Sequence, residues 1–234
     1  MKILALDCSA GPASAAVIEN GKILSSAFVN VKLTHSQTLL PMVKNTLEAA
    51  LLTLSDIDAF AINNGPGSFT GIRIGISAVK GLSLAEKKPC VEVSTLYSIA
   101  QLFKNLDCVV CAAMDARCNQ VYNALFRIKD GTITRLCEDR AVMVDEVIAE
   151  LSALDEKIMI SGDGAALFGS FAEINDKVFI AEEPLRFQNA IGVAFAAEEA
   201  VKEGKTVSPD ELRPFYLRLP QAERELKAKS LKGE

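Results

Sequence analysis

Apolar and polar positions along the chain form an ordered series of short segments. An apolar segment ends at Asp7, and the two alternating segments after it are joined by Asn20-Gly21, a pair typical of β-hairpin turns. A segment with helical periodicity, a further apolar segment and a glycine turn at Gly65 and Gly67 come next. This pattern predicts a meander of three strands followed by alternating helices and strands.

The same series occurs a second time in the chain. Its first apolar segment ends at Asp115, its hairpin turn is Asp130-Gly131, and its later glycine turn contains Gly162 and Gly164. Such repetition predicts two similar α/β lobes. Three strands in a meander followed by alternating helices and strands, occurring twice, resembles the duplicated actin-like (ribonuclease H-like) ATPase fold.

The repeat also predicts how the chain is divided. We expect residues 1–100 to form an N-terminal lobe and residues 101–187 to form a smaller C-terminal lobe. A long helical segment within residues 188–218 is expected to pack back on the first lobe, and residues 219–234 have the composition of a charged tail. Within the first lobe, Pro41 predicts that the first long helix begins or kinks near it.

Composition and charge narrow the classes of function. The chain has 234 residues, of which 50% are hydrophobic, and its formal net charge is −5. A protein that binds nucleic acid alone usually has a basic surface, so the net charge argues against that class. No segment approaches the ~20 apolar residues of a membrane span, and no signal-peptide pattern opens the sequence. Because the six cysteines do not resemble a disulfide framework, we expect a cytoplasmic protein that does not bind membranes.

The run Asn63–Ser83 is rich in glycine but matches no phosphate-binding motif. A P-loop needs Lys followed by Ser or Thr after its last glycine, and the dinucleotide pattern lacks its third glycine here. On a helix, one stripe of this run contains Gly71, Gly75, Ala78 and Leu82. Glycine inside a helix costs about 1 kcal/mol relative to alanine, so the stripe predicts a compensating close contact. Packing within the lobe and packing against another molecule remain open alternatives.

Several segments together resemble one known family. They read INNGPGSFTGIRIGISAVKGLSLA, ILALDCSAGPASAAV, THSQTLLPMV, MDARCNQVY and PFYLR. The chain resembles the TsaB family, also called YeaZ, over nearly its whole length. One departure is Cys8, because the family usually has threonine after the aspartate of the first strand.

The resemblance implies a non-catalytic subunit that binds a TsaD-family subunit. With the TsaE-family ATPase, that complex transfers a threonylcarbamoyl group to N6 of the adenosine beside the tRNA anticodon. The resemblance also implies tRNA contact only through the complex and a homodimer when the chain is alone. It favours an interface role for the helices of the first lobe, with the expected contact residues Leu39, Leu40, Val43, Leu47, Gly71, Gly75, Ala78 and Leu82. On this hypothesis, Gly75→Leu weakens association and leaves the fold intact.

The enzymatic alternative is a nucleotide-dependent small-molecule kinase of the actin-like superfamily. Its phosphate-binding turns would need glycine and hydroxyl residues after the strand-ending aspartates. Here no glycine directly follows either Asp7 or Asp115. Weak nucleotide binding, without a required cofactor, stays open at Asp7, Ser9, Gly162 and Gly164. The sequence has one histidine, His35, so it cannot build a metal site that needs a pair of histidines. A serine or cysteine hydrolase is also disfavoured, because the sequence lacks a nucleophile elbow and has only this one histidine to act as a base. We therefore expect no metal site and no protease or ATPase activity.

Overall fold

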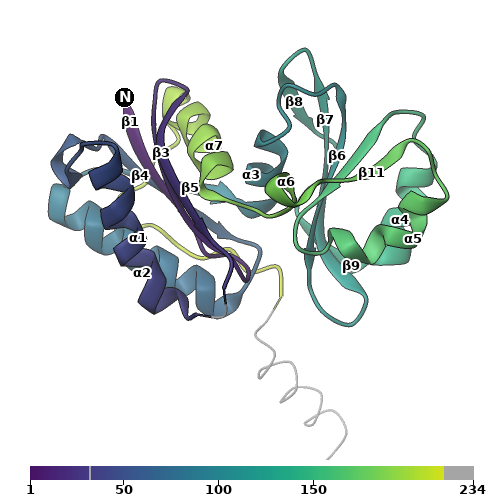
Figure 1. Ribbon diagram of the computed structural model, residues 1–234, viewed down its shortest axis with the longest axis horizontal. Helices are drawn as coiled ribbons and strands as arrows, with labels where there is room; N and C mark the ends of the chain where they lie inside the picture. The colour runs from purple at the N-terminus through teal and green to yellow at the C-terminus, as the bar shows by residue number, and fades with distance from the viewer. Residues whose placement is uncertain (32, 219–234) are drawn as a thin grey trace, which may run out of the picture.

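The computed structural model describes residues 1–31 and 33–218, which form two lobes side by side (Figure 1). Each lobe contains one β-sheet. Two helices lie between the sheets and contact each other, α3 (Thr95–Gln101) and α7 (Ala190–Lys202). Within the described ranges, no helix has both the length and the apolar character needed to cross a membrane.

The first lobe is built on a five-stranded sheet with the order β3-β2-β1-β4-β5. Its strands are β1 (Lys2–Asp7), β2 (Ala13–Glu19), β3 (Lys22–Val29), β4 (Ala59–Gly65) and β5 (Cys90–Ser94). β1 pairs antiparallel with β2 and parallel with β4. The remaining elements of this lobe are α1 (His35–Ala49), the short 3-10 helix η1 (Leu54–Asp56) and α2 (Phe69–Glu86).

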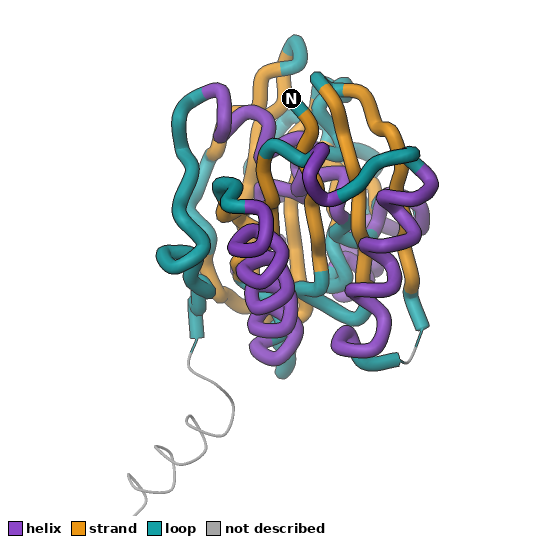
Figure 2. Tube along the Cα trace, turned by 90° about the vertical axis from the view of Figure 1, so that its left-hand side faces the viewer, coloured by secondary structure: helices purple, strands orange, loops and turns teal. Residues whose placement is uncertain are grey.

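Both faces of the first sheet are covered by helices. Successive residues of a strand point to opposite faces, so Leu4 and Leu6 of β1 pack with α1 and α2, while Ile3 and Ala5 pack with α7. This double coverage is why β1 is continuously apolar instead of alternating. Figure 2 shows the first lobe from its outer side, with α1 and α2 in front of the strands.

The second lobe has a six-stranded sheet with the order β11-β10-β6-β7-β8, and β9 pairs with β7. Its strands are β6 (Cys108–Asp115), β7 (Gln120–Lys129), β8 (Thr132–Arg135), β9 (Arg140–Met143), β10 (Ile158–Ser161) and β11 (Val178–Ile180). Its other elements are α4 (Val144–Ser152), η2 (Ala165–Phe168), α5 (Gly169–Glu173) and α6 (Glu183–Arg186). α4, η2 and α5 pack on one face of this sheet, and α3 packs on the other.

The repeated order of elements agrees with the sequence pattern. Asp7 and Asp115 are the last residues of β1 and β6, and both hairpin turns fall at the expected asparagine or aspartate followed by glycine. Of the two alternatives for Pro41, a helix start near it is wrong, because α1 begins at His35 and continues through Pro41. Pro41 is exposed, so the helix loses one backbone hydrogen bond while its opposite face keeps its packing on the sheet.

Candidate functional site

The helix pair α1 and α2 is the first region that the sequence singled out. The side chains that α1 buries follow helical spacing and pack on the sheet: Leu39, Met42, Val43, Thr46 and Leu47. The two helices contact each other along this face of the lobe (Figure 2). α2 is capped at its start by Ser68, whose hydroxyl oxygen accepts a hydrogen bond from the Gly71 amide.

The two glycines of the stripe face the sheet of their own lobe. A Cβ atom added at Gly71 would lie 2.1 Å from the Cys8 carbonyl oxygen. At Gly75, an added Cβ would lie 2.6 Å from Cys8 Sγ and 2.8 Å from Ile62 Cδ1. The compensating close contact is therefore the approach of α2 to β1 and β4, which corrects the expectation that Gly75→Leu leaves the fold intact.

The other expected contact residues divide between the core and the surface. Leu39, Val43 and Leu47 are at most 6% exposed and belong to the core of the lobe. Leu40 is 51% exposed, whereas Ala78 and Leu82 are half-buried against that core. The interface role of this set therefore remains a prediction only for its accessible members.

A groove of about 610 Å³ lies between α1 and α2 on the outer face of the lobe. Among its lining residues are Leu40, Phe69, Arg73, Ile74, Ser77 and Ala78. The small side chains of Ser77 and Ala78 leave the space open, and Leu40 and Ile74 make it apolar. Arg73 supplies positive charge to the α2 side of the groove, and its guanidinium carbon lies 3.8 Å from the centre of the Phe69 ring.

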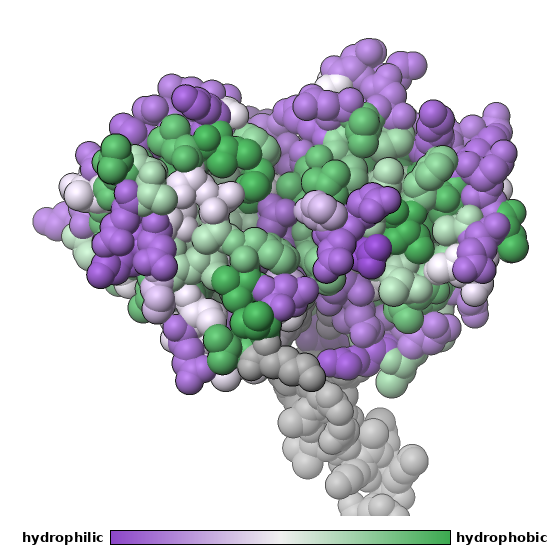
Figure 3. Space-filling model, in the orientation of Figure 1, coloured by the Kyte–Doolittle hydropathy of each residue, from purple (hydrophilic) through white to green (hydrophobic). Residues whose placement is uncertain are grey.

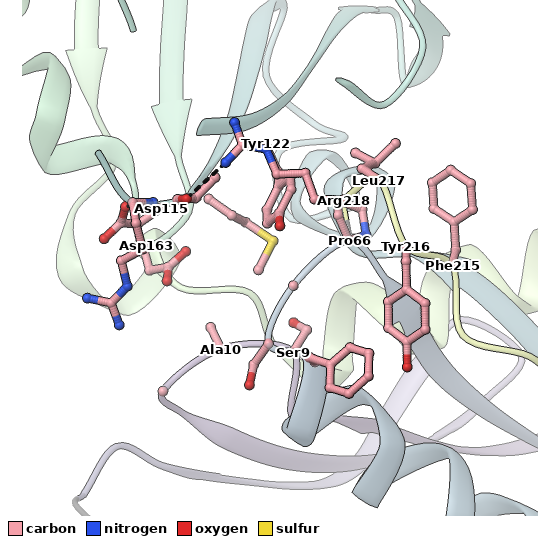
Figure 4. Close-up of a pocket in the computed structure, with 17 residues that line it drawn as sticks. Ser9, Ala10, Pro66, Asp115, Tyr122, Asp163, Phe215, Tyr216, Leu217 and Arg218 are labelled. Atoms are coloured by element: carbon pink, nitrogen blue, oxygen red, sulfur yellow. Dashed lines mark hydrogen bonds between the residues drawn. The ribbon is translucent and has the colours of Figure 1, made fainter. Parts of the chain in front are cut away.

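A second hollow, of about 440 Å³, lies between the lobes. The first lobe contributes Ser9, Ala10 and the turn that leads into α2, and the second contributes Asp115 and Asp163 (Figure 4). We call this hollow the interlobe cleft. It is the place where the strand ends of the two halves of the repeat come together.

Asp7 does not reach the interlobe cleft. Its side chain is fully buried, and its Oδ1 atom accepts hydrogen bonds from the Ser9 amide at 3.2 Å and the Asn63 side-chain amide at 2.8 Å. Burial raises the pKa of the Asp7 carboxyl above its ordinary value, because a charged carboxylate is poorly solvated there. A metal bound in the cleft would therefore find no carboxylate at the end of β1.

The glycine turn after β10 packs against β6. Cβ atoms added at Gly162 and Gly164 would lie 2.0 Å from the Ala113 carbonyl oxygen and 2.9 Å from the Asp115 amide nitrogen. These glycines let the turn approach the neighbouring strand, and neither lines the cleft. Asp163, between them, does line it, and burial raises the pKa of its carboxyl to about 6. Of the four residues expected at a nucleotide site, only Ser9 lines the cleft.

The C-terminal part of the described chain forms one wall of the cleft, which sequence reasoning missed. The Phe215 amide donates to the Asn64 carbonyl oxygen at 2.7 Å, and the Tyr216 ring stacks on Phe69 with 4.8 Å between centres. The Arg218 guanidinium donates to the Ala116 carbonyl oxygen of the second lobe at 3.1 Å (Figure 4). The signal was the segment PFYLR, which carried a family resemblance but no assigned role.

His35 and Cys8 have structural contacts in the first lobe. His35 Nε2 lies 2.9 Å from the Ala10 carbonyl oxygen, which ties the start of α1 to the turn after β1. The Cys8 thiol donates to the Gly71 carbonyl oxygen at 3.0 Å, and burial raises the pKa of this thiol. Cys8 is thus not activated as a thiolate. In the part of the chain that the structure describes, no three His, Cys, Asp or Glu side chains form a metal-binding group.

Comparisons with known proteins agree with this architecture. The family model described as TsaD, tRNA N6-adenosine threonylcarbamoyltransferase, matches residues 27–226. The tRNA threonylcarbamoyladenosine biosynthesis protein TsaB of Escherichia coli is 34% identical over 221 residues, covering 93% of this chain and 95% of that protein. The tRNA N6-adenosine threonylcarbamoyltransferase of Kosmotoga olearia is 32% identical over 120 residues, covering 45% of this chain and 36% of that protein.

Solved structures show the same similarity. YeaZ from Pseudomonas aeruginosa superposes with a TM-score of 0.78 at 30% identity, covering 92% of this chain and 99% of that chain. Component A of the (R)-2-hydroxyglutaryl-CoA dehydratase of Acidaminococcus fermentans gives a TM-score of 0.53 at 14% identity, over 86% of this chain and 99% of that one. The second match concerns the fold alone. Together with the two sheets described above, these likenesses confirm the predicted actin-like fold class.

Proposed function

Because the chain belongs to the TsaB family of tRNA threonylcarbamoyladenosine biosynthesis proteins, we propose that it is a non-catalytic subunit that binds a TsaD-family threonylcarbamoyltransferase. In this proposal the partner covers the groove between α1 and α2. The TsaE-family ATPase joins the complex, and tRNA is contacted only through it. A homodimer of the chain uses the same face when the partner is missing.

The observation that carries the proposal is the apolar groove itself. Leu40 is half exposed on the outer face of the lobe, next to Ile74 and Ala78, although neighbouring leucines of α1 are buried. An exposed apolar groove flanked by polar residues is typical of a protein-binding surface that accepts a helix. Arg73 in the α2 side of the groove favours a partner helix that carries a carboxylate nearby.

The absence of catalysis is proposed from the interlobe cleft. A magnesium-dependent kinase needs carboxylates and cations positioned around the transferred phosphate. Here the carboxyl of Asp7 is buried behind Ser9 and Asn63 and is held by their amides. Among the described residues that line the cleft, the basic side chains are Arg117 and Arg218, and Arg218 donates a hydrogen bond to the second lobe.

The test is light scattering after size exclusion, for the chain alone and mixed with the TsaD-family protein of the same organism. We expect a one-to-one complex that forms at the expense of the homodimer. Leu40→Glu should weaken that complex at least tenfold, because removing the leucine loses about 1.5 kcal/mol of apolar burial and puts a charge in the groove. Leu106→Glu is the matched control, since Leu106 is 48% exposed and lies outside the groove. Equal affinity of both variants and wild type would exclude the groove as the interface.

The kinase alternative makes a different prediction for the isolated chain. It requires magnesium-dependent ATP turnover that is lost in Asp7→Asn. We expect no turnover above a buffer blank with wild-type protein, measured as phosphate release over hours. Turnover that disappears in Asp7→Asn would refute the accessory-subunit proposal.

A further inference from the structure

The proposed partner groove and the interlobe cleft share one wall. Phe69, the first residue of α2, lines both hollows. Arg73 lines the groove, and its Nε–H donates to the Tyr216 hydroxyl at 2.9 Å, while Tyr216 lines the cleft. The wall therefore consists of an arginine and two aromatic rings, stacked so that one side faces the groove and the other faces the cleft.

The segment that supplies Tyr216 is tied to both lobes. We call residues 213–218 the strap. On the first lobe, the Arg213 amide donates to Glu92 Oε1 at 2.6 Å, and the Phe215 amide donates to the Asn64 carbonyl oxygen. On the second lobe, Arg218 donates to the Ala116 carbonyl oxygen and to Gln120, and its guanidinium lies over the Tyr122 ring.

The strap backbone packs closely on the first lobe. A Cβ atom added at Gly65 would lie 2.1 Å from the Phe215 carbonyl oxygen, so the strap backbone lies directly on the turn before α2. Phe215 nevertheless remains 45% exposed, and Figure 3 shows apolar residues gathered beside the point where the described chain ends. By contrast, among the residues that the structure describes, the hydrogen bonds from the strap to the second lobe all come from the Arg218 side chain.

We propose that the strap couples the partner groove to the interlobe cleft. A partner that covers the groove removes water from Arg73, which strengthens its bond to Tyr216 and fixes the strap between the lobes. Arg218 is then held on the second lobe, and the range of angles between the lobes narrows. The inference rests on the proposed function of the groove, and it adds that partner binding restricts the movement of the second lobe.

Coupling of this kind is reciprocal. If the partner binds the strapped arrangement more tightly than the unstrapped one, loss of the strap must weaken partner binding, by at most the ratio of those two affinities. The variant is Arg218→Gln, because Arg218 does not line the groove and its loss removes the second-lobe contacts. The matched control is Arg213→Gln, whose side chain donates to carbonyl oxygens of its own segment.

The experiment measures the distance between spin labels on the two lobes. Ala49 of α1 and Ala149 of α4 are exposed and are replaced by cysteine. The accessible native cysteines, Cys108, Cys118 and Cys137, are replaced by serine. Double electron–electron resonance then gives the distance distribution, with and without saturating TsaD-family partner. We expect the partner to narrow the distribution in wild type and in Arg213→Gln, but not in Arg218→Gln. We also expect Arg218→Gln to raise the Kd of the partner about fivefold or more.

The outcomes separate this inference from the proposed function. If wild type binds the partner, and Arg218→Gln shows the same distance distribution and the same Kd as wild type, the coupling is refuted and the proposed interface is retained. If wild type does not bind the partner at all, the proposed function is refuted, and the coupling with it. The inference is supported if the partner narrows the distance distribution only when Arg218 is present and if Arg218→Gln raises the Kd of the partner.

Discussion

The contact between α2 and Cys8, the residue directly after β1, gives the sharpest test of how this lobe is packed. Gly71→Ala adds one methyl group at a point 2.1 Å from the Cys8 carbonyl oxygen, where real Cβ contacts stay at about 3 Å or more. Because the obstacle is backbone, helix and strand must separate by roughly 1 Å. Such overpacking costs about 1–3 kcal/mol or more, and the gain in helix propensity from alanine offsets at most about 1 kcal/mol.

Because a backbone atom cannot move aside as a side chain can, we expect the upper end of that cost, about 3 kcal/mol, which leaves a net loss of about 2 kcal/mol in the free energy of unfolding. With a urea dependence near 2 kcal/mol per molar, the midpoint of urea unfolding falls by about 1 M. Gly81→Ala is the matched control on the same helix, because an added Cβ at exposed Gly81 meets nothing within 4 Å. Since only helix propensity changes there, its midpoint should rise by about 0.5 M.

The two variants also separate the two interpretations of the glycine stripe. If Gly71→Ala unfolds at the wild-type urea concentration but loses the partner, the stripe faces another molecule and the packing argument is wrong. If Gly71→Ala is destabilised and its folded fraction binds the partner normally, Gly71 is needed for the packing of α2 on its own sheet. Gly75→Leu should then be destabilised as well, since it overlaps Cys8 Sγ and Ile62.

Two further predictions concern the cleft and the C-terminal segment. The folded-state pKa of Asp163, about 6, lies above the ordinary value of 3.8, so stability from its protonated form is present below pH ~4 and is lost as the pH rises through 6. In wild type the free energy of unfolding should therefore fall by at most about 3 kcal/mol between pH 4 and 7, and Asp163→Asn should abolish this fall. If urea unfolding of Asp163→Asn shows the same pH dependence as wild type, the prediction is contradicted. Leu212 is fully buried in the core of the first lobe, so Leu212→Ala should cost about 2–5 kcal/mol in the same assay. A loss below 1 kcal/mol would mean that the segment after α7 is not part of that core.

The sequence was sufficient for features that depend on local pattern. Continuous apolar runs, hairpin turns and glycine turns, repeated in the same order, predicted the actin-like fold class. The strand-ending positions of Asp7 and Asp115 followed directly, since a strand that is covered on both faces stays apolar until it reaches the edge of the sheet. A stripe containing Gly71 and Gly75 was also visible, because helical periodicity fixes which residues share a face.

Only the tertiary structure decided what those features contact. Helical periodicity does not say whether a stripe faces a sheet or a partner, and the distances to Cys8 put the glycines against the sheet and leave Leu40 at the surface. Burial of Asp7 behind Asn63 likewise depends on two strands whose residues are 56 positions apart. The strap joins Tyr216 to Arg73 across 143 positions, and a contact of that span leaves no periodic signal in the sequence. Local pattern therefore determined the elements, whereas close approach between distant segments determined which of their residues remain accessible.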